Sequence, residues 1–334
     1  MIRIGKISYW HVHAWDYTKQ AQQHPETEIV AVWDEIEERG REAADRIGAR
    51  FHGTLGDLLA SDDIDAVIVD APTSMHRDVM VEAARAGKHI FTEKVLAPTL
   101  KEANEIVAAV NENGVKLTVS LPRLNDGYTI AIRELLAEEA LGQITLVRAR
   151  LSHNGATAGW LPEHFFNKEQ CLGGALIDLG CHPMYLTHLF LNEASTGVSV
   201  QYGFVTGKEV EDNAVALLST PSGAVGIVEA GFVNAHSPFT IEIHGTEGTL
   251  LYGTPEPKLL LRTSKKGAGS AEAWREVDTA AKRESAFEQW VGHIRNNTAA
   301  EENIRLALAL TKLMEAAGQS AQEGRRVRLE ELQG

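Results

Sequence analysis

Cysteine is scarce in this 334-residue sequence. Its only two cysteines are Cys171 and Cys181, and neither lies in a Cys-x-x-Cys motif. Two cysteines cannot form a disulfide framework, and without that motif zinc binding and thiol redox chemistry lack support. We therefore expect two small buried thiols in a reducing, cytoplasmic environment.

Long hydrophobic runs are also missing, and we expect no N-terminal signal peptide. No apolar segment approaches the roughly 20 residues needed to span a bilayer, so no membrane association is expected. Residues 1–5 enter an apolar strand pattern at once and lack the layout of a signal peptide.

Basic residues are too few to balance the acidic ones. Lys and Arg total 32 against 46 Asp and Glu, which gives a formal charge of -14. A surface this acidic repels phosphate backbones, so we expect no nucleic-acid partner. Hydrophobic residues make up 44% and charged residues 23%, which is ordinary for a globular chain, and the length indicates about two domains.

The first 120 residues alternate short apolar runs with helical patterns. The expected strands lie at residues 2–7, 28–33, 64–70, 89–92 and 115–119. Helical patterns occupy residues 35–47, 75–86 and 99–113, and Gly87 and Gly114 are placed to end the last two. This alternation predicts an α/β domain, residues 1–120, with a parallel sheet and right-handed crossovers.

The pattern changes after about residue 120. Several β runs with turns between residues 197 and 262 predict an antiparallel sheet, so the second domain, residues 121–334, is expected to be α+β. Residues 267–270 have the composition of a surface loop. The other expected elements are a strand at residues 144–150 and helices at 130–140, 175–191, 286–296 and 304–317.

The turn after the first strand should reveal a cofactor, because open α/β sheets bind ligands at the carboxyl ends of their strands. A dinucleotide fingerprint would have glycine at positions 8, 10 and 13, where this chain has Ser8, Trp10 and His13. Ser8 can make a tight turn at some cost. Trp10 would crowd a pyrophosphate unless its ring points away, so this motif alone supports a dinucleotide only weakly.

Thirteen histidines invite a metal hypothesis. His11 and His13 form the only tight pair, and no Cys-x-x-Cys or His-Glu-x-x-His motif accompanies them. From the sequence we expect no metal.

Asp34 ends the second expected strand, about 20 residues after the first turn, where a carboxylate bonds the adenosine ribose 2′-hydroxyl. Glu35 adds a second negative charge, which disfavours a 2′-phosphate and favours NAD over NADP. An Asp at the start of a helix is equally typical of an N-cap, and both roles can hold at once.

Two more groups follow the third and fourth strands. Thr73, after Pro72, is placed to cap the next helix and leave its amides facing a ligand, whereas His76 taken alone is typical of a helix surface. Glu93 and Lys94 follow the fourth strand. A lysine there can hold a hydroxyl or polarise a carbonyl, although a surface ion pair is the simpler interpretation.

Asp178 and His182 stand four residues apart in a segment expected to be helical, so a helix would put them on one face. A carboxylate beside an imidazole fixes its tautomer and suits a general base. Pro183 removes the amide that would bond Leu179 and predicts a kink there. Without further context, such a pair is structural more often than catalytic.

Together and in this order, these clusters resemble the Gfo/Idh/MocA family of nicotinamide-dependent sugar and cyclitol oxidoreductases. Residues 71–98 are similar to the stretch leading into the family's Glu-Lys-Pro motif, and residues 173–182 to its catalytic helix. Further similarity lies at residues 212–214, 243–248 and 320–327.

The resemblance implies a Rossmann doubly wound parallel sheet followed by an α+β domain with a large, mostly antiparallel open sheet. It also implies that the late helix, about residues 302–318, packs back on the first domain. A homodimer or homotetramer would form through the open sheet.

The resemblance assigns roles to individual residues. Lys94 would hold the reacting hydroxyl, His182 would accept its proton, and Asp178 would orient His182 or share substrate binding. The residues expected along the cofactor are Ser8, Trp10, His11, Asp34, Pro72, Thr73, His76, Glu93 and Lys94. Two departures bear on loop geometry and substrate: Val95 replaces the motif's proline, and Tyr185 stands where many members carry Asp.

The leading hypothesis is an NAD-preferring oxidoreductase acting on a sugar, polyol or cyclitol. Arg123, His153 and Trp160 are candidate substrate contacts, and packing roles suit them equally well. Two alternatives stay open at this point. One is a lyase or hydrolase that uses a tightly held NAD transiently, and the other is a non-catalytic ligand-binding relative without a dinucleotide.

Overall fold

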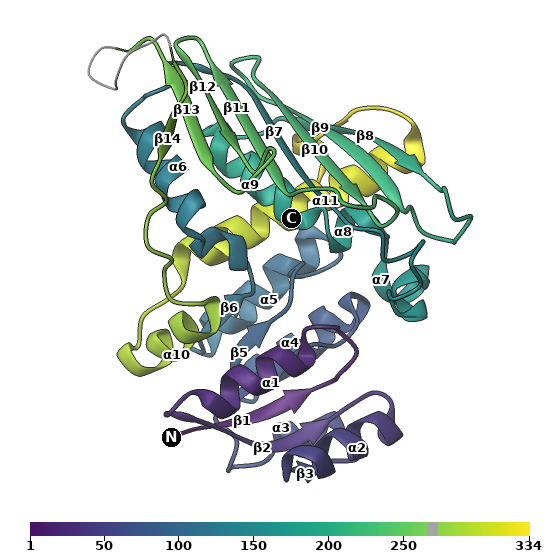
Figure 1. Cartoon of the computed structure of the whole chain (residues 1–334). Coiled ribbons are helices and arrows are strands. Elements are labelled where there is room, and N and C mark those ends of the chain that lie inside the picture. Colours follow the sequence, from purple (N-terminus) through teal and green to yellow (C-terminus); the bar gives the residue numbers. More distant parts are fainter. Residues whose placement is uncertain (266–272) are drawn as a thin grey trace. The chain divides into compact units, whose positions relative to one another are not determined.

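The structure, a computed structural model, describes residues 1–265 and 273–334 and divides into two compact units (Figure 1). The first unit comprises Met1–Ser120, Glu284–Thr311 and Gly334, and the second comprises Leu121–Arg283 and Lys312–Gln333. The loop expected at residues 267–270 lies outside the described residues. In the part of the chain that is described, no helix has the length and apolar character to cross a membrane.

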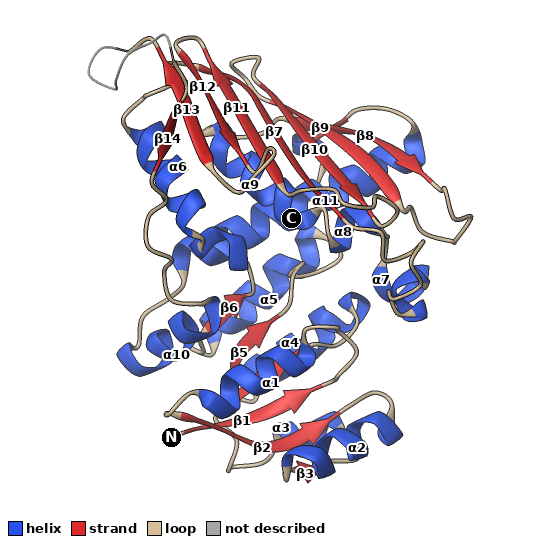
Figure 2. Cartoon of the chain, viewed as in Figure 1, coloured by secondary structure: helices blue, strands red, loops and turns tan. Residues whose placement is uncertain are grey.

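A parallel sheet forms the centre of the first unit, with six described strands in the order β3-β2-β1-β4-β5-β6 (Figure 2). Val67, Ile68 and Val69 in β4 are fully buried, as expected of a strand covered on both faces. The order reverses between β1 and β4, the position where doubly wound sheets bind ligands. The strands are β1 (Ile2–Ile7), β2 (Thr27–Trp33), β3 (Arg50–Phe51), β4 (Ala66–Val69), β5 (His89–Thr92) and β6 (Leu117–Val119).

The helices of the first unit begin and end at local signals in the sequence. Thr99 and Glu102 form a capping box at the start of α5. Gly87 and Gly114 have φ of 73° and 67° just beyond α4 and α5, which confirms that they end these helices. The helices are α1 (Ala14–Gln23), α2 (Glu37–Ile47), α3 (Leu55–Leu59), α4 (His76–Arg85), α5 (Leu100–Glu112) and α10 (Ala286–Asn296).

The late helix α10 completes the core of the first unit. Its Trp290 is fully buried, and the centroid of the indole ring lies 5.7 Å from the ring centroids of both Phe91 and Phe287. The next helix, α11 (Glu301–Glu323), carries Asn303, whose side chain donates to and accepts from the backbone of Val119 at 2.8 Å each. Residues far apart in the sequence thus secure β5 and β6, whose ends carry candidate site residues.

The second unit is built on a mixed, mostly antiparallel sheet with nine described strands in the order β14-β13-β12-β11-β7-β10-β9-β8-β15. Only the pair β7 and β10 is parallel among these described strands. The strands are β7 (Ile144–Ser152), β8 (Gly197–Gly203), β9 (Asn213–Ser219), β10 (Val225–Gly231), β11 (Thr240–Gly245), β12 (Gly248–Tyr252), β13 (Leu259–Thr263), β14 (Arg275–Val277) and β15 (Val327–Arg328).

One face of this sheet is covered by helices and the other is open. A side chain at Gly226 in β10 would approach Thr187 of α9 to 2.7 Å. Gly226 and every second residue of β10 on either side of it therefore face the helix. The opposite face carries apolar side chains that are partly exposed, at 37% for Val215, 44% for Leu217 and 38% for Val225. The α-helices described in this unit are α6 (Gly127–Ala137), α7 (Lys168–Cys171), α8 (Ala175–Asp178), α9 (Cys181–Leu191) and the part of α11 from Lys312 onward.

Candidate active site

The turn after β1 is tight although it lacks the glycines of a dinucleotide fingerprint. Ser8 has a φ of 67°, a left-handed conformation that costs a non-glycine residue about 1–2 kcal/mol. Its amide donates to Trp33 O at 2.7 Å, and its hydroxyl accepts from the Trp10 amide at 3.1 Å. The His11 amide donates to Asp70 O at 3.2 Å, so the turn is also tied to the end of β4.

This turn leads into the N-terminus of α1, the end of a helix that favours an anion. His13 is the N-cap and makes no capping side-chain hydrogen bond, and the Ala14 and Asp16 amides donate to the backbone oxygens of His11 and His13 at 3.0 and 2.9 Å. Trp10 is 5% exposed, so packing rather than free rotation sets the position of its indole. The turn therefore has the tight backbone and the position before a helix that a dinucleotide-binding turn requires, in spite of its sequence.

Asp34 has more partners than the sequence indicated. Its carboxylate accepts hydrogen bonds from the amides of Tyr9 and Ile36 at 2.8 Å each. It also pairs with the Arg39 guanidinium at 2.7 Å, and Arg39 contacts Glu35 as well. Asp34 therefore fixes both the first turn and an arginine beside the position expected for the ribose. Arg39 was not among the expected site residues, although its place in the helix after Asp34 is a signal visible in the sequence.

Glu93 and Lys94 are buried after β5, at 2% and 6% exposure, so the alternative of a surface ion pair is wrong. Glu93 contacts His13 Nδ1 at 2.9 Å and the Tyr17 hydroxyl, and its second oxygen accepts from the Lys94 amide at 3.0 Å. Burial alone would raise the pKa of Glu93, but the charges of His11 and His13 hold this pKa well below its usual range. The Lys94–Val95 peptide is cis even though Val95 replaces the motif's proline.

Two expectations for the loop after β4 are corrected. Thr73 does not cap the next helix, because it lies inside a 3₁₀ turn (Thr73–Met75) that begins after Pro72. His76 is not on the surface: it is 1% exposed, with its ring nitrogens 3.1 Å from Ala71 O and 3.0 Å from Val95 O. Burial lowers the pKa of His76. This imidazole joins the loop after β4 to the loop that carries Lys94.

In the second unit, Asp178 and His182 flank a break between two helices. Asp178 is the last residue of α8, and His182 lies in the first turn of α9. The Gly180 amide bonds back to Ala175 O at 2.9 Å, and Pro183 has no amide with which to bond Leu179 O. The single helix expected over residues 175–191 is therefore wrong, whereas the kink expected from Pro183 is confirmed.

A buried carboxylate that was not among the expected site residues, Glu211, holds α8 in place. Glu211 is 3% exposed and accepts from the amides of Gly174 at 2.9 Å and Leu176 at 3.0 Å. A side chain at Gly174 would come within 2.0 Å of Glu211 O, which explains the glycine before the helix. Burial raises the pKa of Glu211. The sequence signal was its position beside the similar stretch at residues 212–214.

The three candidate substrate contacts fall into two groups. His153 lies with its ring 4.6 Å from that of Trp160, which is 56% exposed. Burial lowers the pKa of His153, and the charge of Asp178 opposes this shift, so Asp178 is near enough to act on it. Arg123 instead stacks on Phe239, 4.1 Å from the ring centroid, and its amide donates to the Tyr185 hydroxyl at 3.0 Å.

Known proteins match both units. Residues 1–121 match the description of an oxidoreductase family with an NAD-binding Rossmann fold, and residues 129–251 match the GFO/IDH/MocA C-terminal domain. A 1,5-anhydro-D-fructose reductase from Ensifer adhaerens is 31% identical over 231 residues, which cover 67% of this chain and 68% of the relative. The chain belongs to the Gfo/Idh/MocA family.

Other family members extend the similarity to most of the chain. A scyllo-inositol 2-dehydrogenase (NAD(+)) from Bacillus subtilis is 28% identical over 80% of this chain and 77% of its own. The crystal structure of GenD2 from gentamicin A biosynthesis, in complex with NAD, has a TM-score of 0.81 at 26% identity, covering 98% and 96% of the two chains. The protein is thus an oxidoreductase with NAD favoured over NADP, and the comparisons give no support to the lyase or non-catalytic alternatives.

We predict that Glu211→Gln weakens α8 and lowers turnover, because glutamine keeps one acceptor oxygen but turns a donor toward the second amide. The free energy of unfolding, measured by urea titration, should fall by about 1–3 kcal/mol. Affinity for NAD, measured by calorimetry, should stay unchanged. Glu209→Gln, at an exposed neighbouring site, is the matched control. Equal stability of the two variants would contradict this role for Glu211.

Proposed function

We propose that this Gfo/Idh/MocA oxidoreductase transfers hydride between NAD and a hydroxyl-bearing carbon of a sugar, polyol or cyclitol. The observation that carries the proposal is the buried Glu93–Lys94 pair at the carboxyl end of β5, in a sheet with the Rossmann strand order. The relatives named as a 1,5-anhydro-D-fructose reductase and a scyllo-inositol 2-dehydrogenase support this substrate class. We propose that the first unit holds the cofactor and the second the substrate.

NAD supplies the hydride acceptor at its nicotinamide, and the residues of this chain handle the charge and the proton. The Lys94 ammonium, brought to the strand end with Glu93, stabilises the developing alkoxide electrostatically. His182 takes the hydroxyl proton as general base, and Asp178 orients it or shares substrate binding. Burial raises the pKa of Tyr185 well above its usual range, so its hydroxyl stays protonated.

Along the cofactor, we propose contacts from Ser8, Trp10 and His11 in the first turn and from Asp34 at the ribose. The buried segments after β4 and β5 would add Pro72, Thr73, His76, Glu93 and Lys94. Among the substrate contacts, His153 and Trp160 have the stronger support, because an exposed indole lies beside an imidazole near Asp178. Arg123 has the weaker support, because its guanidinium already stacks on Phe239.

We predict that Lys94→Ala and His182→Asn each lower kcat by about 100-fold or more, because each removes a group that acts in the transition state. NADH formation at 340 nm, with inositols and other polyols as substrates, measures this loss. His182→Asn should still bind NAD, since its site in the first unit is untouched.

The matched control for these variants is His236→Asn, which changes an exposed histidine of the second unit. Its kcat should equal that of the wild type. Wild-type turnover in His182→Asn would remove His182 from the mechanism, and wild-type turnover in Lys94→Ala would overturn the proposed alkoxide stabilisation.

We predict that Asp34→Asn shifts cofactor preference toward NADP, because it removes a negative charge and releases Arg39 to bind a 2′-phosphate. Asparagine keeps an acceptor oxygen for the Tyr9 amide. The ratio of kcat/KM for NAD to that for NADP should fall by about tenfold, equivalent to about 1.4 kcal/mol. Glu38→Gln, at an exposed position of α2, is the control. An unchanged ratio in Asp34→Asn would exclude this role.

We further propose a cytoplasmic location and a homodimer or homotetramer formed through the open sheet face. Both cysteines are free thiols, which suits a reducing compartment.

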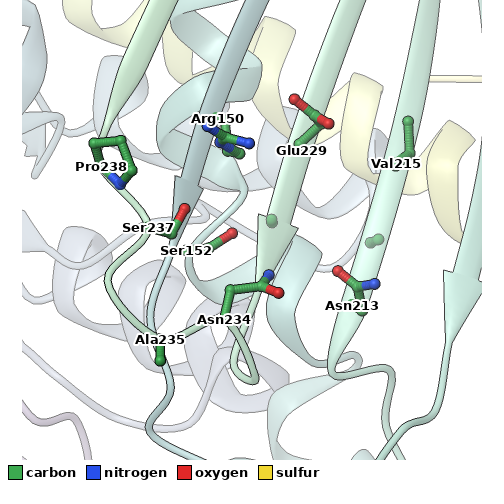
Figure 3. A pocket seen from close by; sticks show the side chains of 11 residues that line it. Arg150, Ser152, Asn213, Val215, Glu229, Asn234, Ala235, Ser237 and Pro238 are labelled. Atoms are coloured by element: carbon green, nitrogen blue, oxygen red, sulfur yellow. The ribbon is translucent and has the colours of Figure 1, made fainter. Parts of the chain in front are cut away.

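A cavity of about 410 Å³ lies on β7, β9 and β10 (Figure 3), and Glu229 at its wall pairs with Arg148 at 2.8 Å.

We predict that Leu217→Glu separates the subunits, because it puts a charge in the middle of the exposed apolar row of β9 and β10. Size-exclusion chromatography with light scattering should give the mass of a single chain. Ile36→Glu, which replaces an exposed apolar residue of the first unit, is the control and should leave the mass unchanged. A wild-type protein that is already a monomer would refute the oligomer.

A further inference from the structure

Three side chains that bind metals well in proteins come together in the first unit. They are His11 and His13 of the first turn and Glu93 after β5, and one ligand atom from each lies within 4.8 Å of the others. His13 Nδ1 is 2.9 Å and His11 Nδ1 is 3.8 Å from the same Glu93 oxygen. The His11 and Glu93 side chains are 5% and 2% exposed, whereas that of His13 is 42% exposed. The cluster is therefore largely buried but reachable from solvent on one side.

The geometry is close to that of a three-ligand metal site. Metal–ligand bonds of about 2.1 Å place neighbouring ligand atoms about 3.0–3.4 Å apart. The separations here, from 2.9 Å up to the limit of 4.8 Å, bracket that spacing, so small side-chain rotations would complete it. Two imidazoles and one carboxylate suit Zn²⁺ and other divalent first-row metals, and three protein ligands leave a coordination position open.

The neighbours of the cluster supply the outer support that metal ligands usually have. The Tyr17 hydroxyl contacts the same Glu93 oxygen and lies 2.7 Å from Ser120 Oγ. The other Glu93 oxygen accepts from the Lys94 amide at 3.0 Å. His11 Nδ1 accepts from the His13 amide at 3.2 Å, so His11 would coordinate a metal through its Nε2. Such second-shell hydrogen bonds orient ligands and tune their basicity.

The position of the cluster indicates what its open coordination position would face. It lies at the N-terminus of α1, where Rossmann sheets bind a pyrophosphate through glycine-rich backbone. Here histidine occupies one of the three fingerprint positions and serine and tryptophan the other two. A cation held at this turn would supply positive charge to the phosphate oxygens at the place where the glycines are missing.

We infer that His11, His13 and Glu93 bind one divalent transition-metal ion, which helps to hold the pyrophosphate of the dinucleotide. This inference replaces the expectation of no metal, which rested on the lack of a nearby partner motif in the sequence. Metal binding itself is independent of the proposed reaction, and only its effect on NAD rests on the proposed function.

The test uses the full chain, stripped with a chelator and titrated with Co²⁺ and then Zn²⁺. Wild-type protein should bind one ion per chain, develop visible d–d absorption with Co²⁺, and lose it as Zn²⁺ displaces the cobalt. His13→Ala should weaken binding by more than about 100-fold, since even changes to second-shell partners cost about 10- to 100-fold. His236→Ala, which removes an exposed histidine, should bind as the wild type does.

Folding is measured separately, so that a loss of Co²⁺ binding can be attributed to the missing ligand and not to unfolding. His13 is partly exposed, so His13→Ala should melt at the wild-type temperature when both are metal-free. A wild type that binds Co²⁺ no more tightly than His13→Ala, or without d–d absorption, would overturn the site. Calorimetry with NAD in metal-free and Zn²⁺-loaded protein tests the second part: affinity should rise on loading in the wild type only. Equal NAD affinities of metal-free and Zn²⁺-loaded wild type would overturn the link to the cofactor but would leave the metal site itself intact.

Discussion

A buried negative charge, the carboxylate of Glu93, governs the carboxyl edge of the first sheet. An unpaired buried charge would cost several kcal/mol, so the chain has to surround it with donors. These donors come from three places: His13 at the start of α1, Tyr17 within α1, and the backbone of Lys94. Because Tyr17 also bonds Ser120, the same carboxylate connects β5, α1 and the end of β6. Lys94 is positioned by this arrangement.

In the second unit, too, a buried carboxylate accepts hydrogen bonds from the backbone of a segment with candidate site residues. Glu211, buried just before β9, accepts the amides at the start of α8 and so positions the segment that carries Asp178 and His182. Its neighbour Asp212 is fully buried and accepts from the amides of Val205 and Thr206 at 2.9 and 2.6 Å. In both units, then, a buried carboxylate fixes the backbone that carries side chains proposed to react.

Much of the fold could be predicted because it is local. Apolar runs gave the strands of the first sheet, and Gly87 and Gly114 marked helix ends through their backbone freedom. Helix α1 was missed because it is short and mostly polar, with buried positions limited to Ala14, Tyr17, Thr18 and Ala21. The two-residue strand β3 carries too short a pattern to detect. The partners of Glu93 could not be foreseen, since His13 lies 80 positions away in the sequence.

The central claim is that the glycine-free turn after β1 holds a dinucleotide whose nicotinamide reaches Lys94. A crystal structure of the protein saturated with NAD measures this most directly. The account predicts the pyrophosphate at the N-terminus of α1, the Trp10 indole clear of it, and the nicotinamide ribose beside Lys94. An indole filling the pyrophosphate position, or a turn without NAD at saturating concentration, would contradict it.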